Sequence, residues 1–126
     1  MKIPTIVDSR GVLTVVEFSS LPWHPKRAYF LSHSNISLSR GQHAHKKLEQ
    51  VLFSISGDWD LRLFDGIHWS TVTLKSGEGG LLLTAGIWRE VSTSDPTAVL
   101  CVLASESFTE SDYIRDLEEY KRWRSS

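Results

Sequence analysis

The sequence is divided into short runs of β-branched and aromatic residues, each of which ends at a turn signal. The candidate strands are Leu13 to Phe18, Arg27 to His33, Gln50 to Ser56, Trp59 to Phe64, Trp69 to Lys75, Gly80 to Thr84 and Ala98 to Ala104. Runs of this length and spacing favour an antiparallel sandwich or barrel over alternating strands and helices. Ser56-Gly57-Asp58 and Asp65-Gly66-Ile67-His68 are predicted hairpin turns, because glycine adopts the positive φ that other residues resist. The sequence therefore predicts a mostly β fold.

The C-terminal segment follows a helical pattern instead. Four apolar side chains recur there at helical spacing: Tyr113, Leu117, Tyr120 and Trp123. Acidic residues occupy the predicted first turn, and Thr109 or Ser111 is the expected N-cap. These features predict one helix over about 110–123, and we expect its aromatic side to cover one end of the β body.

Size and composition fit one soluble domain, with 126 residues of which 40% are hydrophobic and 23% charged. A formal net charge of −1 provides no basic face for nucleic acid and no charged block for an anionic membrane. The first residues, Met1 to Pro4, lack the apolar core of a signal peptide, and no apolar run approaches the roughly 20 residues of a spanning helix. We expect a single cytoplasmic domain over 1–126, with a β-barrel over about 1–106, and neither a nucleic-acid nor a membrane partner.

Two histidines lie at positions i and i+2 in Arg40-Gly41-Gln42-His43-Ala44-His45-Lys46, a stretch with the character of a strand. On a strand, the side chains of His43 and His45 point to the same face. Two imidazoles that titrate near neutrality and face one cavity fit a metal centre or proton-transfer chemistry. The structural alternative is a packed core histidine with one backbone hydrogen bond. A pair on one face, flanked by basic residues, favours a functional site.

The histidine pair resembles the first motif of the cupin superfamily of β-barrels. In that motif, the two histidines are followed by three or four residues, a glutamate, six residues and a glycine. Here four residues separate His45 from Gln50, and six separate Gln50 from Gly57. Glu49 fits the shorter spacing but leaves seven residues before Gly57. In the better register, an amide therefore replaces the carboxylate ligand.

The second cupin motif ends in a metal-binding histidine, and Arg89 occupies that position in Thr84-Ala85-Gly86-Ile87-Trp88-Arg89. A guanidinium has no lone pair to offer and repels a divalent cation. We therefore expect neither a bound metal nor another cofactor. His43 and His45 are then suited to acid–base work, with Arg89 near an anionic group or a developing oxyanion. A neighbouring cation also keeps an imidazole neutral, and hence basic.

A narrower resemblance extends over nearly the whole chain. The matching segments are Asp8-Ser9-Arg10-Gly11, Arg40 to Gln50, Ser56-Gly57, Asp65-Gly66, Gly86-Ile87-Trp88-Arg89-Glu90, Val102 to Glu106 and Asp112-Tyr113-Ile114-Arg115. In this order they resemble the sugar 3,4-ketoisomerases. These enzymes act on dTDP-4-keto-6-deoxyglucose and produce the 3-keto sugar for later amination. One departure is Thr84-Ala85, where the family commonly has prolines, but no reacting group is lost.

The resemblance implies a small cupin-type (jelly-roll) β-barrel with one C-terminal helix, and a homodimer that exchanges N-terminal strands. It also implies that His43 and His45 are the catalytic pair. A proton leaves C3 of the sugar, a cis-enediol forms, and a proton is returned at C4. One histidine serves as base and the other as acid or shuttle, and the assignment between them stays open.

Seven residues are candidates for contacts to the nucleotide sugar: Arg89, Arg10, Arg40, Tyr29, Arg27, Gln50 and Trp88. The planar fork of arginine suits diphosphate oxygens, an amide suits sugar hydroxyls, and an indole stacks on a base or a sugar. Arg27 and Tyr29 lie at i and i+2 and so share a strand face. Each candidate has a structural alternative, such as a surface ion pair, a core aromatic or a structural amide bond.

Three other functions remain open from the sequence. A 3,5-epimerase of nucleotide-linked sugars also removes a proton beside a ketone without metal. A non-catalytic cupin would bind a sugar or small acid without turnover. A metal-dependent dioxygenase or isomerase would need Glu49 as a ligand. The compact His43-Ala44-His45 pair and the Trp88-Arg89 motif favour the ketoisomerase.

Overall fold

The computed structural model describes residue 3 and residues 5–126. Its strands and its α-helix are, in chain order, β1 (Thr5–Asp8), β2 (Gly11–Thr14), β3 (Arg27–Leu31), β4 (Arg40–His45), β5 (Gln50–Ser56), β6 (Asp58–Phe64), β7 (Trp69–Lys75), β8 (Gly80–Leu83), β9 (Trp88–Ser92), β10 (Val99–Ala104), β11 (Tyr113–Ile114) and α1 (Leu117–Ser125). Two short 3-10 helices, Phe18–Ser20 and Glu110–Asp112, complete the secondary structure. Among these residues, no helix is long and apolar enough to cross a membrane.

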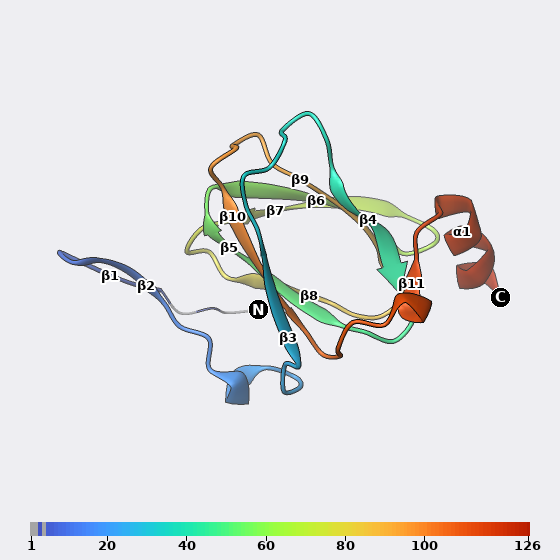
Figure 1. The fold of residues 1–126 in the computed structure, drawn as a ribbon, viewed down its shortest axis with the longest axis horizontal. Coiled ribbons are helices and arrows are strands. Elements are labelled where there is room, and N and C mark those ends of the chain that lie inside the picture. The colour runs from blue at the N-terminus through green and yellow to red at the C-terminus, as the bar shows by residue number, and fades with distance from the viewer. Residues whose placement is uncertain (1–2, 4) are drawn as a thin grey trace.

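Two antiparallel sheets face each other and form the body of the molecule (Figure 1). One has the strand order β3-β10-β5-β8, and the other has the order β11-β4-β9-β6-β7. Their inner faces bury a core of Leu52, Trp59, Leu61, Leu74, Leu83, Val91, Ala98, Leu100 and Val102. Burial of this apolar surface is the main driving force that holds the sheets together. The predicted mostly β architecture is confirmed.

Most predicted strands agree with the structure to within two residues, and β5 and β7 have the predicted bounds. The first predicted strand, Leu13 to Phe18, is wrong, because β2 ends at Thr14 and Phe18 begins a 3-10 helix. The prediction also omitted β1, β9 and β11. The most consequential omission is β9, which lies between β4 and β6 in the centre of its sheet.

The two predicted hairpin turns have different outcomes. β6 and β7 pair antiparallel through the turn at Asp65–His68, where Gly66 has a φ of 103°. The turn at Gly57 is not a hairpin, because β5 pairs with β10 and β8, whereas β6 belongs to the other sheet. Gly57, with a φ of 74°, instead carries the chain from one sheet to the other.

The C-terminal helix begins later than predicted. Asp116 is its N-cap and accepts a hydrogen bond from the backbone N–H of Glu119 (2.9 Å). Neither predicted cap is correct, because Thr109 makes no side-chain cap bond and Ser111 lies inside the preceding 3-10 helix. Tyr113 is also outside the α-helix, in β11, where it pairs with His45 of β4. Long-range pairing with β4 overrides the helical spacing here.

Helix α1 covers one end of the β body, as predicted (Figure 1). Tyr120 is buried against Phe64 and Trp88. The Tyr120 hydroxyl donates to the carbonyl oxygen of Gly86 (2.7 Å). The carbonyl oxygen of Phe64 lies 3.0 Å from the same hydroxyl. This contact anchors the loop from which β9 starts.

Strands β1 and β2 pair with each other and with neither sheet of the body. The hairpin that they form extends away from the body (Figure 1). Its side chains include four exposed apolar residues, Ile6, Val7, Val12 and Leu13. An exposed apolar hairpin of this kind is a candidate interaction surface.

Candidate active site

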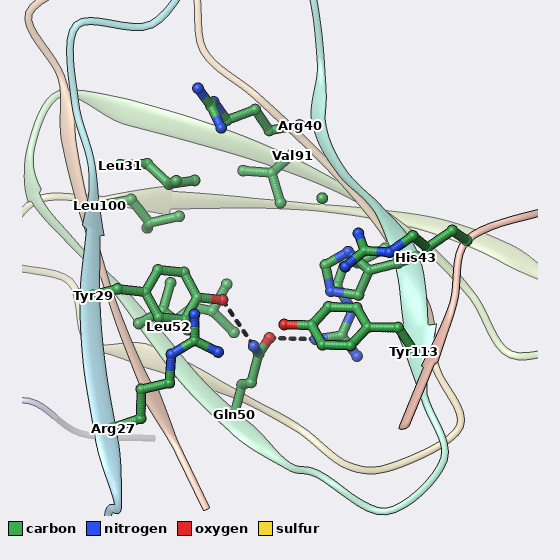
Figure 2. A pocket seen from close by; sticks show the side chains of 14 residues that line it. Arg27, Tyr29, Leu31, Arg40, His43, Gln50, Leu52, Val91, Leu100 and Tyr113 are labelled. Carbon is green, nitrogen blue, oxygen red and sulfur yellow. Dashed lines mark hydrogen bonds between the residues drawn. The ribbon is translucent and has the colours of Figure 1, made fainter. Parts of the chain in front are cut away.

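A cavity of about 220 Å³ opens between the two sheets (Figure 2). Its apolar wall is formed by Leu31, Leu52, Val91, Leu100 and Val102. The polar side chains that line it are Arg27, Tyr29, Arg40, His43, Gln50, Arg89, Tyr113 and Arg115. An apolar enclosure with a few converging polar groups is typical of a small-molecule site.

Strands β4 and β9 bring His43 and Arg89 together. The two residues are partners in the antiparallel register, so their side chains lie on the same face of the sheet. The register shifts between Arg40 and His43, at Gly41, which has a φ of 67°. A bulge of this kind changes the direction of the side chains that follow it.

His43 and His45 share one face of β4, as predicted, and are in direct contact. Their Nε2 atoms lie 3.0 Å apart, and their rings are nearly perpendicular. Only His43, which is 9% exposed, lines the cavity; His45 is fully buried behind it. The ring of Tyr113 packs against both imidazoles, with centroid distances of 4.9 and 4.4 Å. Of the two histidines, His43 is therefore the one that can meet a ligand.

Asp112 fixes the orientation of His45. Its Oδ2 lies 3.2 Å from Nδ1 of His45, and its carboxylate also accepts the backbone N–H groups of Lys47 (2.9 Å) and Leu48 (3.2 Å). Because a carboxylate only accepts, Nδ1 of His45 carries a proton. In a neutral His45, Nε2 then accepts from Nε2–H of His43. Of the four ring nitrogens of the two histidines, Nδ1 of His43 is consequently the one with a free lone pair.

Burial and the nearby arginines keep both imidazoles neutral. Burial, followed by the charge of Arg89 and then by His45, lowers the pKa of His43 from 6.5 to about 2. Burial, followed by the charges of Arg89 and Arg115, lowers the pKa of His45 to about 3. At neutral pH the pair is therefore uncharged, and the lone pair on Nδ1 of His43 is not protonated.

Arg89 is the buried cation of the site. Its guanidinium donates to the side-chain oxygen of Gln50 and to the carbonyl oxygen of Ile87 (2.9 Å), while Gln50 donates to the Tyr29 hydroxyl (2.9 Å), as Figure 2 shows in part. Burial lowers the pKa of Arg89 to about 10, which leaves it charged at neutral pH. No carboxylate among the described residues forms a salt bridge with it, and its Nε has no partner there. A buried unpaired cation favours binding of an anion.

Three further arginines lie around the cavity. Arg27 lies over the Tyr29 ring (4.8 Å), and Arg115 lies over the Tyr113 ring (4.2 Å). Arg115 also pairs with Glu110 (2.8 Å), and Arg40 is exposed. The cavity and its surroundings therefore carry more positive charge than negative charge, which suits a diphosphate.

The donor set does not fit a divalent metal. Nε2 of His43 and Nε2 of His45 hydrogen-bond to each other, and the side-chain oxygen of Gln50 accepts from Arg89. Glu49, the alternative carboxylate, accepts from the indole N–H of Trp23 (3.0 Å). In the part of the chain that the structure describes, no three His, Cys, Asp or Glu residues are grouped to hold a metal ion. A metal site needs three or four converging donors.

Comparison with known proteins assigns the family. The model of FdtA, described as WxcM-like, C-terminal, matches residues 1–125. A TDP-4-oxo-6-deoxy-alpha-D-glucose-3,4-oxoisomerase from Aneurinibacillus thermoaerophilus is 38% identical over 119 residues, which cover 94% of this chain and 86% of that protein. The chain belongs to the sugar 3,4-ketoisomerase family. The predictions of this family and of isomerase activity are confirmed.

Solved structures of ketoisomerases share the fold. A 3,4-ketoisomerase from Helicobacter canadensis is 34% identical with a TM-score of 0.92, covering 99% of this chain and 95% of that one. QdtA, a sugar 3,4-ketoisomerase from Thermoanaerobacterium thermosaccharolyticum solved with TDP, is also 34% identical with a TM-score of 0.92, covering 98% and 91%. The predicted cupin-type barrel with one C-terminal helix is confirmed.

In this ketoisomerase, the cavity brings together six of the predicted site residues: Arg27, Tyr29, Arg40, His43, Gln50 and Arg89. His45 supports the site from behind. Trp88 does not line this cavity, because neighbouring residues of a strand point to opposite faces and Arg89 faces inward. Trp88 packs on Tyr120 (5.6 Å) and donates to Glu90 (3.1 Å).

Arg10 does not reach the cavity of its own chain. It lies in the β1–β2 turn with 88% of its side chain exposed, and it pairs with Asp8 (2.8 Å). Sequence reasoning also missed Asp112, Tyr113 and Arg115 as site residues, although the structure places all three at the site. The available signal was that all three lie in the last segment that resembles the family.

Proposed function

We propose that this chain is a metal-independent 3,4-ketoisomerase that converts TDP-4-keto-6-deoxyglucose to a TDP-3-keto-6-deoxyhexose. The observation that carries the proposal is a neutral His43 lying opposite the unpaired, buried guanidinium of Arg89 in one small cavity. The substrate class is supported by the 38% identical oxoisomerase and by a histidine-to-asparagine variant of QdtA that was solved with TDP-4-keto-6-deoxyglucose.

The chemistry requires a base near C3 and a cation near the ketone oxygen. Nδ1 of His43 takes the proton from C3, and the electron pair of that bond forms the C3–C4 double bond of an enediolate. Arg89 stabilises the negative charge that develops on the oxygen at C4. Return of a proton to C4 and movement of the hydroxyl hydrogen from O3 to O4 complete the 3-keto product. Tyr29 and Gln50 are positioned to hydrogen-bond the sugar oxygens.

The size of the cavity divides the substrate between two regions. At about 220 Å³, the cavity is smaller than the roughly 300–1,000 Å³ of a pocket for a complete drug-sized ligand. We therefore place the hexose inside it and the diphosphate nearer the exposed Arg40 and Arg115. The nucleoside then extends beyond the barrel.

We further propose that 1–126 functions as one domain in a homodimer that exchanges its N-terminal strands. The support is the β1–β2 hairpin, which pairs with no strand of the body and exposes Val7 (73%) and Val12. Burial of such a surface by a second copy removes it from water. Arg10, at the turn of this hairpin, is then carried toward the partner and becomes available to its site.

The test is proton NMR in D2O with EDTA, in which purified protein is mixed with TDP-4-keto-6-deoxyglucose. We expect a 3-keto product with deuterium at C4, and none with His43→Ala. Exchange at C5 as well as C3 would indicate a 3,5-epimerase instead. Binding without turnover, equal in wild type and His43→Ala, would identify a sugar-binding cupin.

A further inference from the structure

We propose that Asp112 is a positioning residue that fixes the tautomer of the histidine pair and connects it to solvent, so that the relay His43–His45–Asp112 conducts protons out of the substrate cavity. The inference deepens the proposed function and rests on it. It starts from His45, both of whose ring nitrogens are occupied: Nε2 by His43 (3.0 Å) and Nδ1 by Asp112 (3.2 Å). A fully buried imidazole with no free nitrogen acts through its neighbours.

The carboxylate of Asp112 is held rigidly. It accepts from the backbone N–H groups of Lys47 and Leu48, and its own carbonyl oxygen accepts from Lys46 N–H (3.0 Å). The next residue, Tyr113, pairs with His45 across β11 and β4. Because Asp112 has little freedom to move, it specifies which nitrogen of His45 is protonated.

Asp112 also lines a second cavity, separate from the substrate cavity. This second cavity has a volume of about 480 Å³, and its lining also includes Lys46, Lys47, Thr109 and Ser111. The side chain of Asp112 is 16% exposed, whereas that of His45 is completely buried. A continuous chain of hydrogen-bonding groups therefore runs from the substrate cavity to a separate, solvent-accessible hollow.

The proton balance along this chain closes. When Nδ1 of His43 accepts the proton from C3, the proton on its Nε2 passes to Nε2 of His45. His45 is then an imidazolium beside the Asp112 carboxylate, and its Nδ1 proton leaves through Asp112 to solvent. The reverse sequence delivers a solvent proton to His43 while substrate fills the cavity. The charge of Asp112 stabilises the imidazolium during the transfer.

The first test is nitrogen-15 NMR of histidine-labelled wild-type protein at neutral pH, with signals assigned from His43→Asn. We expect His45 to be protonated on Nδ1 and His43 on Nε2. Protonation of His45 on Nε2 would overturn the proposal. This measurement needs no substrate, so it stands even if the ketoisomerase assignment fails.

The second test compares Asp112→Asn with wild type in D2O, by counting deuterium gained at C3 of recovered substrate for each molecule of product formed. We expect this ratio to fall several-fold in Asp112→Asn. We also expect kcat to fall at least about tenfold and at most about the 10⁴-fold seen when an orienting aspartate of a serine protease triad is replaced. KM and the affinity for TDP should stay within about twofold, because Asp112 does not line the substrate cavity.

The matched control is Asp116→Asn. Asp116 lies four residues later and caps α1, where asparagine caps as well as aspartate. We expect wild-type values for every readout. An unchanged exchange ratio in Asp112→Asn, with kcat lowered or not, would limit Asp112 to a structural role and contradict the proposal. Absence of turnover in wild type would instead contradict the proposed function, and the tautomer measurement would remain decisive.

Discussion

The guanidinium of Arg89 donates directly to the side-chain oxygen of Gln50. These two residues occupy the positions at which the cupin motifs carry a histidine and a carboxylate that bind metal. A cation–amide hydrogen bond thus lies where a metal centre would lie. The site retains positive charge near the histidine pair, but the charge is now covalently part of the chain and needs no ligand set.

Replacement of Arg89 by methionine should abolish most of the activity while the fold persists. Loss of one stabilising donor of a developing oxyanion costs about 10²–10³ in kcat, and we expect a loss of that order. Removing a buried charge that has no ionic partner is favourable, whereas loss of the donor to Gln50 and Ile87 is unfavourable, so we expect the free energy of unfolding to change by at most about 1–3 kcal/mol. Steady-state kinetics and urea denaturation measure the two effects. Arg62→Met, at an exposed arginine of β6, is the control and should retain full activity; equal activity of both variants would contradict the role of Arg89.

The double variant Gln50→Glu with Arg89→His should acquire a metal site. The two Nε2 atoms of His43 and His45 are already 3.0 Å apart, a separation compatible with two nitrogen ligands at about 2.0–2.1 Å from one zinc ion. The introduced glutamate and histidine would complete a four-donor set. We expect about one zinc per chain by isothermal titration and elemental analysis, against none for wild type. Gln50→Glu alone, in which Arg89 pairs with the new carboxylate, is the control; zinc binding by that variant would show that Arg89 is not what excludes the metal.

The histidine pair should make stability depend on pH below neutrality. Both pKa values are lowered, to about 2 and about 3, from 6.5 in the unfolded chain. Below pH 6.5 the unfolded chain therefore binds protons that the folded protein does not, and the free energy of unfolding falls as pH falls. The slope approaches about 1.4 kcal/mol per pH unit for each histidine.

Urea denaturation of wild type and His43→Asn between pH 7 and pH 5 measures this contribution. The wild type should lose stability more steeply than His43→Asn. His68→Asn, at an exposed histidine, should follow the wild-type curve. Parallel curves for wild type and His43→Asn would show that His43 titrates normally.

Short sequence patterns correctly predicted the strands and side-chain faces that depend only on neighbouring residues. The bounds of β5 and β7 and the shared face of His43 and His45 follow from strand periodicity and turn residues. The turn at Gly57 has the local signal of a hairpin, but pairing of β5 with β10, far away in sequence, makes it a crossing between sheets. Such pairings are decided by long-range packing, which no short window contains.

The site could likewise be predicted only where its residues follow a local sequence pattern. The motif residues in β4 and β5 were found because their spacing is regular. Asp112 and Tyr113 were assigned to a helix, because Tyr113 lies at helical spacing from later aromatic residues. The backbone of Tyr113 is nevertheless a strand, and the α-helix begins only at Leu117. The hydrogen bonds that the backbone N–H groups of Lys47 and Leu48 donate to the Asp112 carboxylate hold this segment extended beside β4. Tertiary contacts there outweigh local propensity.

A charge placed on the β1–β2 hairpin should dissociate the proposed dimer. Val7→Asp would put a carboxylate into a surface that a second copy buries, and a buried unpaired charge is strongly unfavourable. We expect a monomer by sedimentation velocity where wild type is a dimer, with lower activity if Arg10 serves the partner's site. Ile67→Asp, at a 79% exposed apolar residue of the β6–β7 turn, is the matched control and should remain dimeric. A dimeric Val7→Asp would place the interface elsewhere.

Two glycines with similar φ angles allow the steric cost of an alanine substitution to be separated from its conformational cost. Gly57 and Gly77 have φ values of 74° and 81°. An added Cβ at Gly57 would lie 2.6 Å from Cβ of Ala98, whereas no atom of the described residues lies within 4 Å of an added Cβ at Gly77. Gly77→Ala should therefore cost only the positive-φ penalty of about 1–2 kcal/mol. Gly57→Ala should cost that amount plus about 1–3 kcal/mol for the clash with a buried residue. Urea denaturation compares the two directly, and equal losses would mean that the crossing between the sheets has room for a methyl group.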